Sequence, residues 1–401
     1  TSGSFSSPSM RIASVFGTRT GAVTINQFDD DTLARGVRRS EEVARLAPED
    51  REFMPALDPQ AYAVVPHGFD RATAEVGAEA IAKGVSVCLK DAIAAGLTAA
   101  GFAETRAGYS ALANSKGLFG YHTSTNAYIG ETVRTPDGTG SGWAAQAAPS
   151  ARALHFPAVA QSASTKARTS REPRPLAPGS YPTILEPACV ASLLELLMWS
   201  MSRRDADEGR SYFSAPNGGN RLGEKLFGDG IQVYSDPADP RVPGTPWGED
   251  GLPQQRVDWI EGGVVKALRC DRYWATQKNV APIPGGANLI MGGGSGSVLD
   301  LIAATKRGVL VTSLWYVRSL DPQTLTFTGL TRDGVFWIED GKVRHPVRNF
   351  RWNESPVSML KNVVGMSEAV AMPPRPSRDA TTVVPALALS SFNFSSVSEA
   401  V

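Results

Sequence analysis

The residues able to bind a metal or attack a peptide bond are few and widely separated in this chain. Its 401 residues include four histidines and three cysteines. A catalytic zinc ion needs three protein ligands and an open position for water. No two histidines have helical spacing, and no histidine stands near a cysteine, so the sequence predicts neither a metal site nor a catalytic nucleophile. These residues are His67, His122, His155, His345, Cys88, Cys189 and Cys270.

Glu186, Cys189 and Glu195 are the only residues of a metal-ligand type near the longest apolar segment. Residues 187–204 are apolar on nearly all sides, which predicts a buried helix beginning at Pro187. Glu186 precedes this helix and should stabilise its start. Glu195 lies inside the apolar stretch, where a carboxylate should be paired or at an edge. We expect neither to bind a metal, because a lone carboxylate does not make a zinc site.

The remaining periodicities predict an α+β chain of two domains. A proline-rich stretch at residues 172–179 marks the boundary, so the predicted domains are 1–175 and 176–401. Helices and antiparallel strands fill the first domain. The expected elements are a strand pair at 11–25 with its turn at 18–21, helices at 30–46, 70–83 and 156–171, and strands at 98–106, 107–113 and 117–131.

The second half of the chain predicts a buried helix among hairpins. Glycine pairs and Asp-Gly turns separate apolar runs near residues 262 and 341. Residues 205–251 are rich in Gly, Pro and Asp and predict a long irregular segment. The other expected elements are a strand at 182–185, helices at 299–307 and 359–366, and a strand at 309–317.

Composition excludes two classes of partner. Forty basic and forty acidic residues give a net charge of zero, which argues against a nucleic-acid binder. The longest apolar run, residues 190–201, is too short to cross a membrane and contains Glu195. Three cysteines without a pattern favour a reducing compartment, so we expect a cytoplasmic protein.

Several segments resemble the TldD/PmbA family, also called modulators of DNA gyrase. They are residues 181–200, 329–347 and 384–387, together with 205–212 and 223–228. One branch of that family is a zinc peptidase with an H-E-x-x-x-H helix, whereas this chain reads Glu195-Leu-Leu-Met-Trp-Ser200 in the corresponding stretch. Neither Cys nor His follows residue 364, where the peptidase branch adds a cysteine ligand. The chain therefore resembles the PmbA or TldE branch, which lacks the zinc motif.

The resemblance implies a fold and a division of labour. The C-terminal domain would be built around a curved antiparallel sheet, and the buried helix would line the relic of a peptidase cleft. No catalytic residue, metal or cofactor is expected here. A TldD-type partner would carry the zinc, and the pair would degrade unfolded peptides or process modified peptide precursors. The alternative is a homodimeric peptide-binding or scaffold protein. Family members have several dozen residues before Arg11, so we expect a fragment or a processed form.

A glycine-rich turn supplies the candidate binding residues. Gly292-Gly-Gly-Ser-Gly296 lacks the Lys-Ser/Thr of a P-loop and the spacing of a dinucleotide fingerprint. In the resembled family the similar backbone lies near the substrate channel, and glycine allows another backbone to approach closely. A flexible turn before a helix is an equally good interpretation. The predicted substrate-binding residues are Asn288, Gly292, Gly293 and Gly294.

Overall fold

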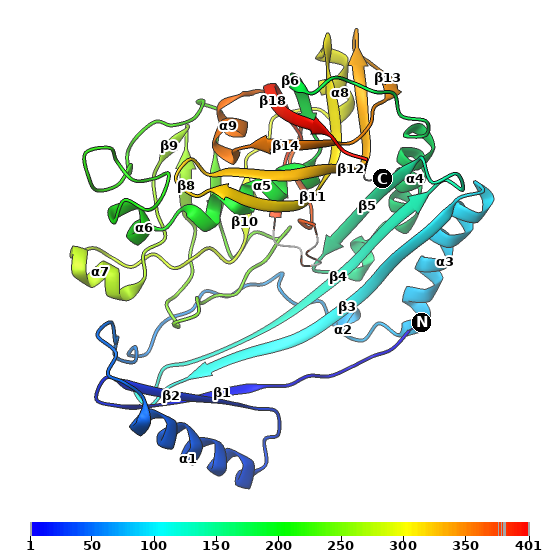
Figure 1. The fold of residues 1–401 in the computed structure, drawn as a ribbon. Helices are drawn as coiled ribbons and strands as arrows, with labels where there is room; N and C mark the ends of the chain where they lie inside the picture. Colours follow the sequence, from blue (N-terminus) through cyan, green and yellow to red (C-terminus); the bar gives the residue numbers. More distant parts are fainter. Residues whose placement is uncertain (1, 376, 378, 380–381, 400–401) are drawn as a thin grey trace. The chain divides into compact units, whose positions relative to one another are not determined.

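The computed structural model describes residues 2–375, 377, 379 and 382–399. Its helices and strands confirm a mixed α+β chain (Figure 1). The helices are α1 Asp30–Leu46, α2 Arg71–Ala74, α3 Ala78–Ala94, α4 Phe156–Thr169, α5 Pro187–Ser200, α6 Arg203–Asp207, α7 Arg272–Lys278, α8 Val298–Ala304 and α9 Pro356–Lys361. The strands are β1 Met10–Phe16, β2 Arg19–Ile25, β3 Thr98–Ala113, β4 Phe119–Arg134, β5 Ser141–Ala148, β6 Gly179–Leu185, β7 Val233–Ser235, β8 Val257–Glu261, β9 Val264–Val265, β10 Leu289–Met291, β11 Arg307–Asp321, β12 Thr326–Glu339, β13 Lys342–Pro346, β14 Phe350–Glu354, β15 Val363–Met366, β16 Val370–Ala371, β17 Thr382–Val384 and β18 Leu387–Val397.

The chain forms two compact units, Thr1–Leu57 with Asp271–Pro282, and Asp58–Cys270 with Ile283–Val401. The predicted boundary between residues 175 and 176 falls inside the second unit and stays a prediction.

In the first unit, β1 pairs antiparallel with β2, and α1 packs on the hairpin. The hairpin turns at Gly17, whose φ is +64°, and not at residues 18–21 as expected.

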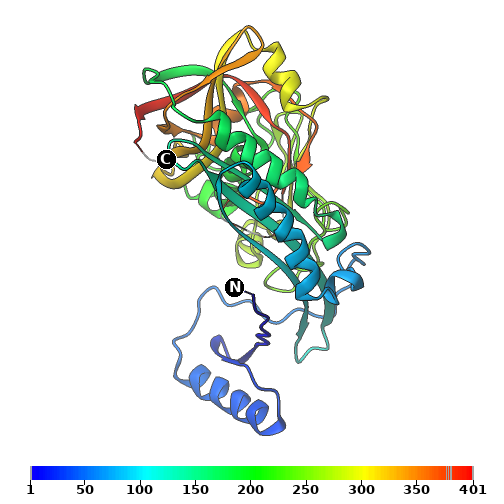
Figure 2. The ribbon, with the colours of Figure 1, turned by 90° about the vertical axis from the view of Figure 1, so that its right-hand side faces the viewer.

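A three-stranded antiparallel sheet of order β3-β4-β5 opens the second unit. The chain crosses it in one 16-residue strand, β3, where two shorter strands were expected. Helices α3 and α4 pack against this sheet (Figure 2). The expected helix at 70–83 was wrong: a short α2 is followed by α3, which runs through Gly84. A Cβ at Gly84 would lie 2.6 Å from the Phe156 ring, so this glycine permits helix packing and does not end the helix.

The C-terminal sheet curls into a barrel-like form. Its path runs β11-β6-β18-β14-β12-β13, and β11 also pairs with β12, so the path closes on itself. Helix α5 packs against β6, β11, β17 and α9 in the largest hydrophobic core. The expected helix at 187–204 ends at Ser200, and α6 follows it separately. The expected helix at 359–366 is instead α9 followed by β15, which pairs with β18.

A second sheet of order β16-β17-β10-β7-β8-β9 carries the glycine-rich turn. Strand β10 pairs with β7 on one side and with β17 on the other. The turn after Met291 then leads into α8, whose start is closed by a capping box between Ser297 and Asp300. None of the helices in the described ranges combines the length and hydropathy required to cross a bilayer.

Packing of α4 on β5 generates the first prediction. A Cβ on Gly142 would lie 2.2 Å from the backbone oxygen of Ala163 and 2.5 Å from the nitrogen of Ala167. Gly142→Ala should therefore lower the free energy of unfolding by about 3 kcal/mol, because a rigid helix backbone must move. Gly108→Ala is the matched control in the same sheet, since no atom lies within 4 Å of its Cβ position. Urea unfolding followed by tryptophan fluorescence compares them, and equal effects would contradict the packing argument.

Candidate functional site

Helix α5 contains the stretch from Glu195 to Ser200, in which neither histidine nor cysteine occurs. Glu186 caps its start with extended backbone, and the Glu186 Oε2 accepts a hydrogen bond of 2.6 Å from Lys166 Nζ. Pro187 stands in the first turn, as expected. Seven of the fourteen residues of the helix are buried, but Trp199 is 72% exposed near its end. The helix is therefore a core element with one end that reaches solvent.

Burial disfavours the charged forms of the two reactive groups on α5. Burial raises the pKa of the Cys189 thiol, whose sulfur lies 3.5 Å from the backbone oxygen of Val311. A protonated buried thiol is a poor nucleophile and a poor metal ligand. Burial also raises the pKa of Glu195 to about 7. The described residues offer the Glu195 carboxylate no ion pair or hydrogen bond, and the residue is half-buried, so of the two expectations it meets the one of lying at an edge.

Within the described part of the chain, no three His, Cys, Asp or Glu side chains lie close enough together to hold a metal ion. The predicted absence of a metal site remains a prediction about the protein in solution. Ion pairs connect the acidic residues that follow α5, since Arg210 Nη2 lies 2.8 Å from Asp205 Oδ1 and also pairs with Glu208. These carboxylates therefore have a structural partner.

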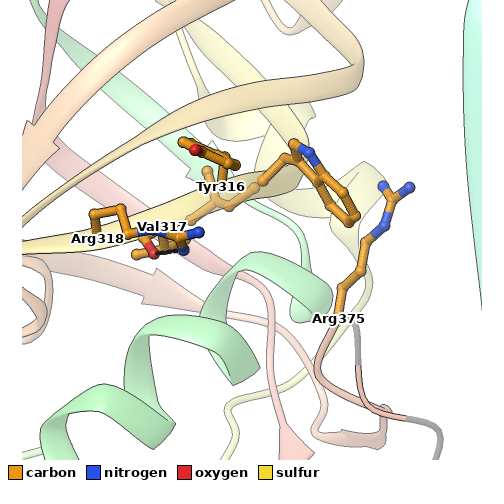
Figure 3. Close-up of a pocket in the computed structure, with 6 residues that line it drawn as sticks. Tyr316, Val317, Arg318 and Arg375 are labelled. Atoms are coloured by element: carbon orange, nitrogen blue, oxygen red, sulfur yellow. Dashed lines mark hydrogen bonds between the residues drawn. The ribbon is translucent and has the colours of Figure 1, made fainter.

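A pocket of about 280 Å³ opens at a bulge in β11, the strand against which α5 packs (Figure 3). Trp315 faces Leu330 and Arg318 faces Thr328, so Tyr316 and Val317 stand opposite the single residue between those partners. Tyr316 has a φ of +55°, which a side chain this large rarely adopts. Leu314, Trp315, Tyr316, Val317, Arg318 and Arg375 line the pocket.

Cations and aromatic faces alternate around this pocket. The Arg318 guanidinium lies 4.3 Å from the Tyr316 ring centroid, and its Nη1 donates to the backbone oxygen of Val317. No carboxylate of the described residues pairs with Arg318. The Arg375 guanidinium lies between two rings, 4.7 Å from Trp315 and 4.9 Å from Trp143. Stacking on aromatic faces fixes the planes of these cations without consuming all of their donors.

A buried carboxylate holds Arg375 in place. Asp333 has a side chain that is 0% exposed, and its Oδ2 accepts a hydrogen bond from Arg375 Nη1. The Ser141 hydroxyl donates to Asp333 Oδ1 at 2.6 Å, and Arg375 also donates to the Ser313 hydroxyl at 3.0 Å. The Asp333 backbone is itself left-handed, with a φ of +57°. The lining can thus bind an anionic or planar group, but it contains no nucleophile or general base.

The sequence alone did not indicate this pocket. The strand was expected over residues 309–317, and neither the bulge nor the ion pair between residues 42 positions apart was anticipated. The sequence did contain one indication of an irregular strand. In Trp315-Tyr316-Val317-Arg318, four consecutive large residues interrupt the alternation of apolar and polar residues that is typical of a strand. Nothing in the local sequence identifies Asp333 and Arg375 as partners.

The predicted binding residues lie elsewhere, on β10 and its following turn. Asn288 is buried, and its side-chain amide donates to the backbone oxygens of Asp236 and Val242, both at 2.6 Å. Its Oδ1 accepts from the Asp236 backbone at 2.8 Å. The Asn288 side chain therefore anchors the 236–242 loop. Neither Asn288 nor any of the three predicted glycines lines the pocket beside α5.

The chain itself fills much of the space that the glycines leave. A Cβ at Gly293 would lie 2.6 Å from the Ala369 nitrogen, and one at Gly294 would lie 2.4 Å from the Met366 oxygen. Gly294 also donates its backbone N–H to the Ser367 oxygen at 2.9 Å. The glycines do allow another backbone to approach closely, as expected, but that backbone belongs to residues 366–369 of the same chain. At Gly292 a Cβ would meet only atoms of Gln232, the nearest being its Cβ at 3.4 Å, so this position alone of the three tolerates a side chain.

The raised pKa of Glu195 generates a prediction about pH. The folded chain keeps the proton up to a pKa of about 7, whereas the unfolded chain releases it near 4.5. Between these values the folded state binds more protons, so stability falls as pH rises and stays lowered above about 7. Glu195→Gln should therefore unfold like wild type at pH 4.5 and become increasingly more stable up to pH 7. Urea unfolding at several pH values tests this, and a constant difference would contradict it.

Family models match most of the chain. Residues 71–171 match the PmbA/TldA metallopeptidase central domain, and residues 178–396 match the PmbA/TldA metallopeptidase C-terminal domain. No curated protein sequence matches the chain.

Solved structures share its fold at low identity. TldE from Thermococcus kodakarensis has a TM-score of 0.84 at 20% identity, covering 96% of this chain and 90% of that one. A putative modulator of a DNA gyrase from Thermotoga maritima has a TM-score of 0.82 at 15% identity, covering 96% and 88%. A putative modulator of DNA gyrase from Bacteroides thetaiotaomicron has a TM-score of 0.81 at 18% identity, with the same coverage. The C-terminal family model alone spans more than half of the chain, so this protein belongs to the PmbA/TldD family.

Proposed function

We propose that this chain is the PmbA/TldE-type, non-zinc subunit of a two-chain metallopeptidase. The chain binds the substrate, and a TldD-type partner carries the zinc and performs hydrolysis. The substrates are unfolded peptides or modified peptide precursors, and the location is cytoplasmic. The family models support the peptidase context, since both are described as metallopeptidase domains.

The observation that carries this proposal is the chemistry beside α5. The pocket at the β11 bulge presents the Arg318 cation, the Arg375 cation and aromatic faces. Its lining has the groups that bind a peptide carboxylate, because a guanidinium forms strong charge-assisted hydrogen bonds with carboxylates. The reactive groups on α5 are a protonated thiol and a carboxyl group whose charged form is disfavoured, and neither lines the pocket. Such a site favours binding over bond cleavage.

The glycine-rich turn remains a proposed second contact for peptide backbone. Of its residues, Gly292 is the usable probe, since Gly293 and Gly294 are packed against residues 366–369. A substitution at Gly293 would disturb the fold and would say nothing about peptide binding. Asn288 supports this turn through the loop that it anchors.

The division of labour can be tested by reconstitution. Purified alone, the chain should hold no stoichiometric zinc and should not hydrolyse an unfolded peptide substrate. Mixed with a TldD-type chain from the same source, it should form a complex that hydrolyses that substrate. Elemental analysis, light scattering and peptide digestion measure these outcomes. Glu195→Gln should leave turnover by the complex nearly unchanged, because the reacting metal belongs to the partner.

Zinc bound by the chain alone, or hydrolysis without a partner, would contradict the proposal. Stable homodimers that bind peptide and ignore every TldD-type chain would instead favour a scaffold function.

The carboxylate-binding role of Arg318 gives a further prediction. In the assembled complex, Arg318→Gln should raise KM about tenfold for peptides with a free C-terminal carboxylate, because one charge-assisted contact is lost. The kcat should change little. Arg351→Gln is the matched control, since Arg351 is an exposed arginine of the same sheet outside the pocket. An equal rise in KM for C-terminally amidated peptides would show that Arg318 does not recognise the carboxylate.

A further inference from the structure

Strand β4 is longer than the strand that covers its outer edge. Strand β5 pairs with β4 only from Ala127 to Arg134. Residues 119–126 continue beside β3 on one side, and Figure 1 shows β3 and β4 extending beyond β5. This half of β4 is therefore an edge strand on the side that β5 leaves open. An exposed edge presents backbone donors and acceptors to any extended chain.

The direction of those backbone groups follows from one hydrogen bond. The Thr125 N–H donates to the Gly68 oxygen at 2.9 Å, so Thr125 directs its backbone groups to the open edge. The β3–β4 register has no irregularity, and direction alternates with a period of two residues. Tyr121 and Thr123 therefore direct their N–H and C=O groups to the same edge. No described residue forms a hydrogen bond to the backbone of either one on that side.

A pocket of about 530 Å³ lies along this open edge. All five consecutive residues from Phe119 to Thr123 line it. Because successive side chains of a strand lie on opposite faces, this lining follows the edge of β4 and not one of its faces. The opposite wall is also formed by consecutive residues, Tyr62 to Pro66, which have no strand or helix assignment apart from a turn at the end. The pocket is thus a slot between an edge strand and a stretch of irregular chain.

The side chains in the slot are aromatic and uncharged. The Tyr62 and Trp247 ring centroids are 5.1 Å apart, and His122 meets Trp247 edge-on at 6.3 Å. Burial lowers the pKa of His122, so its ring stays neutral at physiological pH. None of the lining residues is Asp, Glu, Lys or Arg. At the rim, Val64, Phe119 and Tyr121 are 83%, 65% and 59% exposed.

We propose that this slot binds an extended peptide segment that adds to the edge of β4 and places an aromatic side chain against Tyr62 and Trp247. The unpaired backbone groups of Tyr121 and Thr123 recognise the peptide main chain, as in other strand-addition complexes. The uncharged aromatic lining selects the side chain. The slot shares no residue with the pocket beside α5, so this inference does not depend on the proposed role in a peptidase.

The probe is a fluorescein-labelled heptapeptide with acetylated and amidated ends and a central Phe flanked by Thr and Val. Its blocked ends remove the carboxylate that Arg318 is proposed to bind. Two matched peptides serve as controls. One carries N-methyl groups on alternate backbone amides, and the other has Asp in place of the central Phe. Fluorescence anisotropy with the full chain should show saturable binding of the parent peptide. Each matched peptide should bind with a Kd at least about tenfold higher, because hydrogen bonds or apolar contacts are lost.

Two variants of the protein complete the test. Val64→Arg places a charge at the rim of the slot, and Thr123→Pro removes the outward N–H while keeping the pairing with β3. Each variant should lower the affinity for the parent peptide about tenfold. Leu299→Arg on α8 is the control, because Leu299 is a similarly exposed leucine, 74%, outside the slot. Circular dichroism checks folding, and Val64→Arg alone decides the outcome if Thr123→Pro does not fold.

The absence of saturable binding, or equal binding of the three peptides, would overturn the proposal. So would unchanged affinity in Val64→Arg. Loss of binding in Arg318→Gln, with Val64→Arg unaffected, would assign the peptide to the pocket beside α5 instead.

Discussion

The buried carboxylate of Asp333 holds together the parts of the chain that form the pocket beside α5. Ser141 approaches it from β5, and Arg375 approaches from the segment after β16. A charge with 0% exposure is tolerated only when a partner and hydrogen bonds compensate for its lost hydration. Arg375 in turn stacks between Trp143 and Trp315. One ion pair therefore fixes the contact between two sheets and orients a cation that lines the pocket.

Close backbone packing is the second constraint on this fold. Gly142 allows α4 to touch β5, and Gly294 allows the glycine-rich turn to touch the Met366 oxygen. Glycine is used at these positions because two pieces of the same chain must approach within van der Waals distance. The glycine-rich turn thus has a structural reason to exist. Its proposed contact with a peptide is an additional role, and Gly292 is the position where that role can be examined separately.

Secondary structure was predicted well where neighbouring residues in the sequence determine it. The buried helix α5, the helix α1 at residues 30–46 and the Asp-Gly hairpin after β12 depend on neighbouring residues, and each formed as expected. Errors occurred where a residue served a distant contact. Gly84 was expected to end a helix but packs on Phe156, and residues 363–366 joined β18 as a strand because an unpaired edge was available. Tertiary contacts override local preference at such positions.

The sequence by itself determined the family resemblance, the α+β class and the absence of histidine from the stretch around Glu195. These depend on residue type and short spacing, which a linear chain displays directly. Only the tertiary structure decided that Asp333 pairs with Arg375, that β11 bulges at Tyr316, and that β5 ends before β4 does. The ion pair joins residues 42 positions apart, and the bulge and the strand ends depend on how neighbouring strands pair. The physical reason is that a binding surface is a property of several strands at once, and no single segment encodes it.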